Sequence, residues 1–254
     1  MIPVNPFVTA DSAKAYAQGR PYFHPLVMER VREALDVGFP VATAVDVACG
    51  TGLSSLALLA LADRVVATDA SPEMLAHAPK DARIDYRLAP AEALPLADES
   101  AELITVSSAF HWFDRAAFLR EARRVLRPGG WLVVYENFFR GQPEDAAFTR
   151  WLGAYYAAHP SPPRVRTPFT DDDAHDAGFS FVERLSYENT WMFGLIGLVN
   201  YLLSQSNAVA ARGQSADALR AELTRQLEPF FGDDKTSFSF AGFIWILRRE
   251  SRHA

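Results

Sequence analysis

Two glycines and an acidic residue lie where one predicted strand ends and a helix begins. The segment "AVDVACGTGLSS" (44–55) places Asp46, Gly50 and Gly52 at this corner. Glycine has no Cβ, so the backbone at such a corner turns tightly and can lie against a ligand. The N–H groups at the start of the following helix favour an electron-rich partner. The pattern therefore predicts a ligand site.

This corner does not match the two common phosphate-binding loops. A dinucleotide-binding fold needs G-x-G-x-x-G, but Leu53-Ser54-Ser55 follow Gly52, so the third glycine is missing. The Gly-Lys-Ser/Thr of a P-loop is also absent from the sequence. Asp46 would repel a pyrophosphate, whereas a cationic or zwitterionic ligand would tolerate it.

A second acid, Asp69, ends the next predicted strand, 17 positions after Gly52. An acid in this place can accept hydrogen bonds from both hydroxyls of a ribose. The expected ligand therefore has a ribose, tolerates an acid near its other end and lacks a pyrophosphate. S-adenosylmethionine meets all three requirements, and we predict it as the cofactor.

The elements that must position these residues alternate along the first half of the chain. Strand-like segments lie at 43–49, 64–70, 84–89, 102–110 and 130–138, and helix-like segments at 53–62, 71–78 and 113–130. Such alternation implies right-handed crossovers and an α/β fold with a doubly wound, mainly parallel sheet. Ligands bind such sheets beyond the carboxyl ends of the strands, where Gly50 and Asp69 are expected.

The second half of the chain lacks this regular alternation of strands and helices. Strand-like segments at 180–192 and 236–249 enclose helical ones. We predict a single domain over 1–254, with a core at about 35–140 plus these two strands, and a helical lid at about 142–178 and 194–231. The polar segment 200–215 suits a mobile hinge of that lid. The alternative for the same apolar helices is a rigid dimer surface.

The amino-acid composition limits which binding partners and which cellular compartment we expect. The formal net charge is -6, from 25 basic and 31 acidic residues, which argues against capture of nucleic acid. Cys49 is the single cysteine, so a disulfide framework is excluded and a reducing cytoplasm is expected. The sequence has neither a signal pattern nor an 18-residue apolar run, so we expect no membrane partner. We predict a small-molecule partner, no metal site, and a monomer or homodimer.

Four segments resemble motifs of the class I S-adenosylmethionine-dependent methyltransferases, in their type 11 small-molecule branch. They are "VDVACGTG" (45–52), "VVATDASPEMLAHA" (65–78), "APAEALPLADESAELITVSSAFHWFD" (89–114) and "LREARRVLRPGGWLVVYE" (119–136). The "FHWFD" ending and "YAQGRPYFHP" (16–25) resemble the trans-aconitate methyltransferase-like group. The resemblance implies a seven-stranded Rossmann-like sheet with a helical lid insertion. It also implies methyl transfer to an O, N or C nucleophile of a small molecule, with a carboxylate among the options.

The resemblance also implies a set of cofactor contacts. Arg20 is expected to pair with the cofactor carboxylate, Asp46 to reach its amino group, and Met74 to pack on the adenine. Pro90 replaces an acid that many members use near the adenine, which leaves that recognition to Ala91 and Glu92. The complete predicted set is Tyr16, Arg20, Asp46, Ala48, Cys49, Gly50, Gly52, Asp69, Ala70, Met74, Ala91, Glu92 and Ser107. Plain packing is the alternative for Cys49 and Met74.

Four residues are predicted to face the methyl acceptor, namely His111, Trp112, Asn137 and Tyr156. His111 is the candidate catalytic base, because histidine titrates near neutrality; a structural histidine is the alternative. The aromatic residues of the lid favour an aromatic or apolar acceptor, whereas Arg164 and Arg166 favour a carboxylate. Two further hypotheses remain open: a catalytically inactive cofactor-binding regulatory protein, and a dinucleotide-dependent oxidoreductase.

Overall fold

The computed structural model describes residues 7, 9–35, 38–165, 167–210, 216–232 and 235–251. Seven strands form one sheet in the order β3-β2-β1-β4-β5-β7-β6. They are β1 (Val41–Val47), β2 (Ala62–Asp69), β3 (Ile84–Leu88), β4 (Ala101–Ser107), β5 (Leu126–Gly141), β6 (Phe179–Phe193) and β7 (Thr236–Arg249). Strands β1 to β5 pair in parallel, and β7 is antiparallel to both its neighbours.

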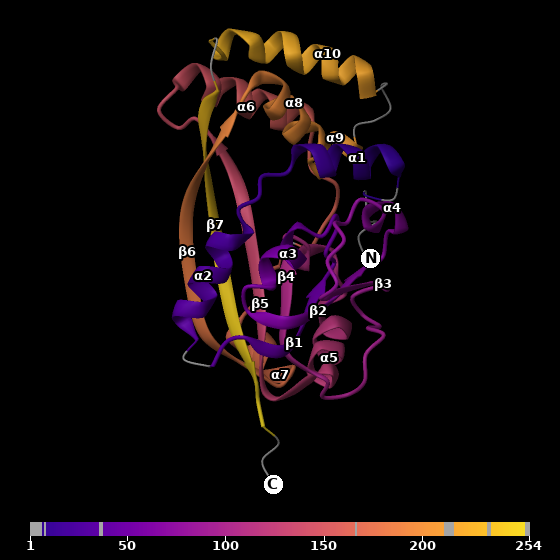
Figure 1. The fold of residues 1–254 in the computed structure, drawn as a ribbon. Coiled ribbons are helices and arrows are strands. Elements are labelled where there is room, and N and C mark those ends of the chain that lie inside the picture. The colour runs from indigo at the N-terminus through magenta and orange to yellow at the C-terminus, as the bar shows by residue number, and fades with distance from the viewer. Residues whose placement is uncertain are drawn as a thin grey trace.

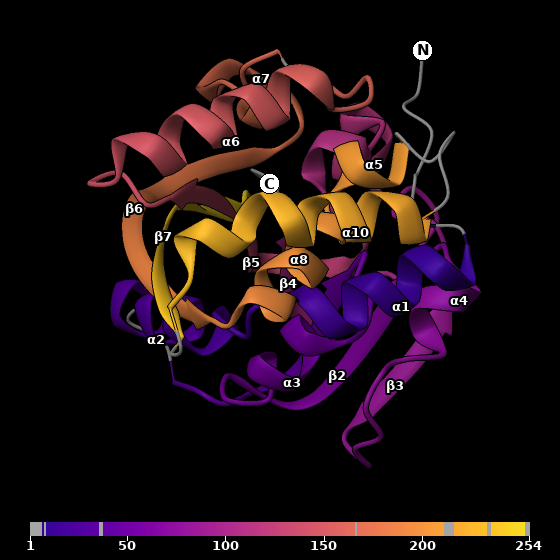
Figure 2. The same cartoon turned by 90° about the horizontal axis from the view of Figure 1, so that it is seen from above.

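Helices cover both faces of this sheet, as Figures 1 and 2 show. α5 (Arg115–Val125) and α7 (Asp171–Asp176) lie on one face, and α2 (His24–Ala34) and α3 (Leu53–Leu58) lie on the other. The short α4 (Pro72–Leu75) follows β2. The predicted doubly wound, mainly parallel seven-stranded fold is confirmed.

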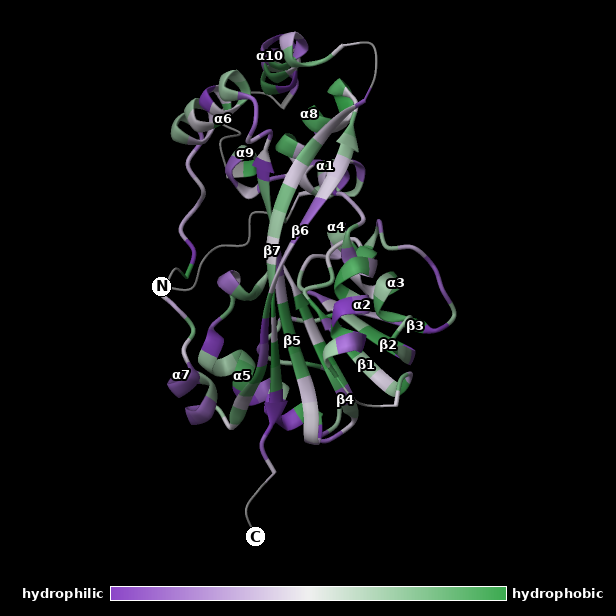
Figure 3. Ribbon diagram, turned by 90° about the vertical axis from the view of Figure 1, so that its left-hand side faces the viewer, coloured by the Kyte–Doolittle hydropathy of each residue, from purple (hydrophilic) through white to green (hydrophobic). Residues whose placement is uncertain are grey.

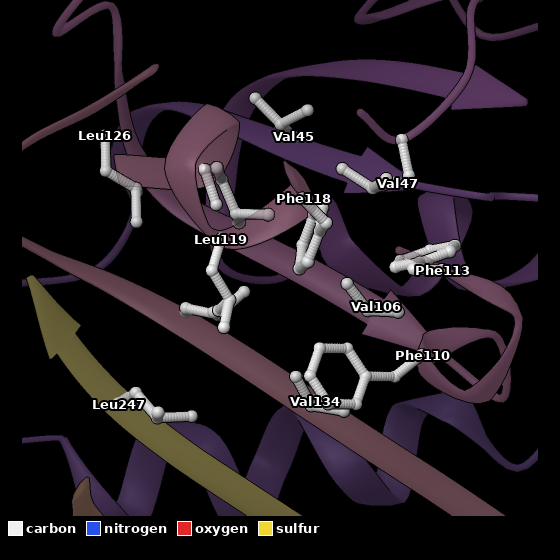
Figure 4. Close-up of a cluster of buried hydrophobic side chains, with 14 of the residues drawn as sticks. Val45, Val47, Val106, Phe110, Phe113, Phe118, Leu119, Leu126, Val134 and Leu247 are labelled. Carbon is white, nitrogen blue, oxygen red and sulfur yellow. The ribbon is translucent and has the colours of Figure 1, made fainter. Parts of the chain in front are cut away.

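The alternation of side chains along β1 explains this two-sided burial. Val45 and Val47 point into a cluster with Phe118 of α5, whereas Ala44 points into a cluster with Val27 of α2. Figure 4 shows the first cluster, in which the aromatic rings of α5 and of the loop after β4 meet the strands. The central strands β1, β4 and β5 are mostly hydrophobic, whereas α7 is largely hydrophilic (Figure 3).

A third cluster lies above the sheet and contains the helices predicted as a lid (Figure 1). These helices are α6 (Ala146–Ala158), α8 (Leu195–Leu203), α9 (Ser206–Ala210) and α10 (Ala216–Leu227). α1 (Ala10–Gly19) joins them by packing along α8. A Cβ at Gly19 would lie 2.4 Å from the backbone oxygen of Asn200, so only glycine allows this close approach.

Two elements differ from the sequence expectation. The predicted lid segment 142–178 includes α7, yet α7 lies at the opposite end of the sheet from α6 and α10 (Figure 1), because Ala174 is buried in the cluster of α5. The helix predicted at 113–130 ends at Val125. Leu126 already pairs with Ala101 of β4, so the chain becomes a strand before the glycines.

Candidate functional site

The glycine corner after β1 adopts left-handed backbone conformations. The φ angles of Ala48, Gly50 and Gly52 are 56°, 57° and 79°. A Cβ at Gly52 would lie 2.6 Å from the hydroxyl oxygen of Tyr86, and a Cβ at Gly50 would lie 3.1 Å from the methyl group of Met74. Ala48 adopts a left-handed conformation although it carries a Cβ, so the backbone of this corner is strained at that residue.

Asp69 links the end of β2 to this corner. One carboxylate oxygen accepts the N–H of Gly50 at 2.8 Å, and the other accepts the N–H of Ser71 at 2.8 Å. Desolvation raises the pKa of Asp69, and these backbone N–H groups act in the opposite direction. Each oxygen keeps a further lone pair, and the side chain borders a cavity.

The carboxylate of Asp46 is bound by side chains of two neighbouring elements. It is fully buried and accepts hydrogen bonds from the hydroxyls of Ser54, Ser55 and Thr105 at 2.6, 2.7 and 3.0 Å. Burial raises the pKa of Asp46 to about 6. Because three side chains already satisfy it and it lies behind the glycine loop, its observed contacts hold α3 and β4 against β1.

A cavity of about 520 Å³ opens at the carboxyl ends of β1, β2, β4 and β5. It brings together most of the predicted site: Tyr16, Arg20, Ala48, Gly50, Asp69, Ala70, Met74, Ala91, Glu92, Ser107, His111, Trp112, Asn137 and Tyr156. Asp46, Cys49 and Gly52 do not line it. Its position matches the point where strand order reverses between β1 and β4, which is where such sheets bind ligands.

Arg20 crosses from α1 to the lid at one wall of the cavity. Its guanidinium donates to the carbonyl of Ser204 at 2.9 Å and lies 4.5 Å above the ring of Tyr16. Its Nε is buried and has no hydrogen-bond partner within the described part of the chain. This orphaned donor and the backbone of Gly50, which lines the same cavity, fit a zwitterionic ligand with a carboxylate.

His111 and Glu136 both line the cavity and are within hydrogen-bond distance of each other. Nδ1 of His111 lies 2.9 Å from Oε1 of Glu136. His111 belongs to a short 3-10 helix after β4 (η1, Phe110–Trp112), and Glu136 lies in β5. Sequence reasoning missed Glu136, although a carboxylate inside the apolar run "WLVVYENF" is the signal that marks it.

The remaining wall comes from β5, from the lid and from the segment 159–169, which is rich in proline. It includes Phe138, Phe139, Tyr201, Gln205 and Asn207, which were not predicted. The hydroxyl of Tyr156 and the side-chain amide of Gln205 form a hydrogen bond at 3.2 Å. Arg164 lines the cavity, whereas Arg166 lies outside the described residues.

Comparison with known proteins places this geometry in a family. Residues 45–134 match the family model "Methyltransferase domain". An uncharacterized methyltransferase of Mycobacterium tuberculosis is 32% identical over 206 residues, which span 79% of this chain and 77% of the relative.

Solved structures agree with this assignment. A protein described as a type II methyltransferase of Anaeromyxobacter dehalogenans is 26% identical with a TM-score of 0.68, covering 89% of this chain and 95% of its own. A geranyl diphosphate methyltransferase in complex with S-adenosylmethionine has a TM-score of 0.53 at 15% identity, covering 89% of this chain and 85% of its own, and shows the shared fold. The chain belongs to the S-adenosylmethionine-dependent methyltransferases.

Proposed function

We propose that this methyltransferase transfers a methyl group to a small molecule bound in the 520 Å³ cavity. The observation that carries the proposal is that one cavity is lined both by Asp69 and by His111 and Glu136. Its volume lies in the range of small-molecule sites, and its walls combine aromatic rings with a few polar groups. A cofactor and a small acceptor therefore share one space.

The cofactor half of the cavity offers partners for each part of S-adenosylmethionine. The free lone pairs of Asp69 suit the ribose hydroxyls, and Met74 suits one face of the adenine. Arg20 suits the carboxylate, because its guanidinium is buried, fixed by Ser204 and still has a free donor. Glu92 uses Oε1 to accept the N–H of Asp114 at 3.0 Å and keeps its other oxygen for the adenine amino group.

The bound cofactor supplies an electrophilic methyl group on a positively charged sulfur. The protein positions the acceptor in line with that methyl group and excludes water from the site. Positioning of this kind contributes ~7–11 kcal/mol to catalysis. α6 and α8 contribute Tyr156 and Tyr201 to the cavity wall, and α10 packs on α8, so these helices suit water exclusion.

Calorimetry tests the cofactor half. S-adenosylmethionine and its demethylated product are expected to bind at micromolar levels, and NADH and ATP are expected to bind far more weakly. Tighter binding of NADH would point to the dinucleotide alternative.

An activity assay tests the acceptor half. The protein is incubated with methyl-labelled S-adenosylmethionine and a pool of small metabolites, and labelled products are identified by mass spectrometry. Appearance of a labelled small molecule supports the proposal. Binding of the cofactor with no labelled product in any pool would favour the inactive regulatory protein.

A further inference from the structure

The pair formed by His111 and Glu136 carries an inference about the acceptor. Both side chains line the cavity, and their exposed fractions are 18% and 10%. The pair joins two neighbouring strands at their carboxyl ends, since His111 follows β4 and Glu136 belongs to β5. With the ribose placed at Asp69 under the proposed function, the pair belongs to the acceptor side of the same cavity.

Backbone contacts fix both members of the pair. The N–H of Val165 donates to the carbonyl of His111 at 3.0 Å. The hydroxyl of Tyr187 donates to the carbonyl of Glu136 at 3.0 Å. A Cβ at Gly242 would lie 2.2 Å from that same carbonyl oxygen, so the neighbouring strand β7 also confines it. These contacts hold the main chains of both residues, and the 2.9 Å contact between Nδ1 and Oε1 joins their side chains.

The geometry selects one tautomer of His111. A carboxylate is an acceptor only, so Nδ1, which faces Glu136, carries the hydrogen. Nε2 of the neutral ring then presents a lone pair. It has no hydrogen-bond partner among the residues that the structure describes. His111 is therefore built to receive a proton at Nε2, with Glu136 as its positioning residue.

We propose that the methyl acceptor is a phenol-type hydroxyl whose proton passes to Nε2 of His111. This rests on the proposed function. The acceptor oxygen forms a bond to the methyl carbon, and the carbon–sulfur bond breaks with its electron pair left on sulfur. The proton of the hydroxyl moves to Nε2, and Glu136 stabilises the resulting imidazolium until the proton leaves to water.

The chemistry of the His111–Glu136 pair favours a phenol over a carboxylate or an amine as the acceptor. A carboxylate has already lost its proton, so it has none to give to Nε2 of His111; Arg164 of the same cavity would attract it, but Glu136 beside His111 would repel it. A neutral amine attacks with its own lone pair and needs no prior proton loss. A phenol has an ordinary pKa near ~10 and keeps its proton at neutral pH, so transfer of that proton to a neutral imidazole assists its attack. The rings of Trp112, Phe138 and Tyr201 suit an aromatic acceptor.

Nitrogen NMR of the protein without ligands tests the tautomer. Neutral His111 is expected to carry its hydrogen on Nδ1 in the native protein, and Glu136→Ala is expected to let the Nε2–H form appear. The surface pair of His175 and Glu250, 3.3 Å apart, offers a matched control through Glu250→Ala, which should leave the His111 signals unchanged. A native His111 with its hydrogen on Nε2 would overturn the proposal.

Probe acceptors of different acidity test the proton transfer. The assay pH is chosen so that 4-nitrophenol is ionised and 4-methylphenol is not. His111→Gln is expected to slow methylation of 4-methylphenol ~100-fold or more, and that of 4-nitrophenol less than ~10-fold. His175→Gln, a substitution of an exposed histidine, should slow neither.

The outcomes separate this inference from the broader proposal. Equal slowing of both phenols would show that His111 is structural and would overturn it. Methylation of benzoate or aniline in preference to phenols, or no methylation of any phenol, would also overturn it. The proposed function would survive such a result if calorimetry showed cofactor binding and the assay showed methylation of another small molecule.

Discussion

The carboxylate of Asp69 accepts the backbone N–H of Gly50 at 2.8 Å, although the two residues are 19 positions apart. This bond ties the carboxyl end of β2 to the left-handed corner that follows β1. The residue that we propose as the ribose ligand therefore also shapes the glycine loop. Substitutions of Asp69 are therefore expected to affect both ribose binding and the conformation of the glycine corner.

Asp69→Asn is expected to weaken S-adenosylmethionine binding at least tenfold. The amide keeps the size of the side chain but removes charge-assisted hydrogen bonds, each of which is worth ~1.5–3 kcal/mol. Calorimetry measures the affinity, and circular dichroism checks the fold. Asp63→Asn, at the exposed start of the same strand, serves as the control. Unchanged affinity in Asp69→Asn would place the ribose elsewhere.

Gly19→Ala is expected to separate α1 from α8 and to weaken cofactor binding. Its Cβ would lie 2.4 Å from the backbone oxygen of Asn200, and a backbone atom cannot rotate away. Arg20 would then lose its contact with Ser204. Gly153→Ala in α6 is the matched control, because a Cβ there meets nothing within 4 Å. Equal affinities of the two variants would refute the coupling.

Hydrogen exchange tests whether the lid moves. Backbone amides in 200–210 are expected to exchange faster in the free protein and to become protected when cofactor and acceptor bind. Residues 211–215 of the predicted hinge lie outside the described residues. Strong protection in both states, with a concentration-dependent dimer, would favour the rigid dimer surface instead.

Two buried groups are expected to give opposite pH dependences of stability. Burial lowers the pKa of His24 to about 3, and its Nδ1 lies 3.0 Å from the hydroxyl of Tyr135. The unfolded chain protonates this histidine near pH 6.5, so its contribution to the free energy of unfolding is lost as pH falls below that value. The pKa of Asp46 is instead raised to about 6, so its contribution falls as pH rises from about 4 to 6.

Single variants are expected to separate these effects. In His24→Asn the side-chain oxygen can replace Nδ1 as the acceptor. This variant should lower the slope of the free energy of unfolding against pH by up to about 1.4 kcal/mol per pH unit. Asp46→Asn should make the loss of stability between pH 6 and 4 steeper. The free energy of unfolding is measured by denaturant titration at pH 4, 5 and 6. Parallel profiles for native protein and both variants would contradict these assignments.

The sequence by itself determined the sheet and the glycine corner. Short apolar strands alternate with helices, and this local periodicity predicts a parallel sheet whatever the distant contacts are. The left-handed φ angles of Gly50 and Gly52 are likewise a local property, since glycine alone adopts them without strain. Asp69 could be identified because it ends the next predicted strand, 17 positions after Gly52.

Tertiary structure decided which distant residues meet. Glu136 lies beside His111 only because β5 pairs with β4 in one register, and a shift by one residue would turn its side chain to the other face. Arg20 reaches Ser204, 184 positions away, because Gly19 lets two helices touch. The environment of Asp46 also follows from tertiary packing: the three hydroxyls that donate to its carboxylate come from α3 and β4, and packing between elements has no signature in local sequence.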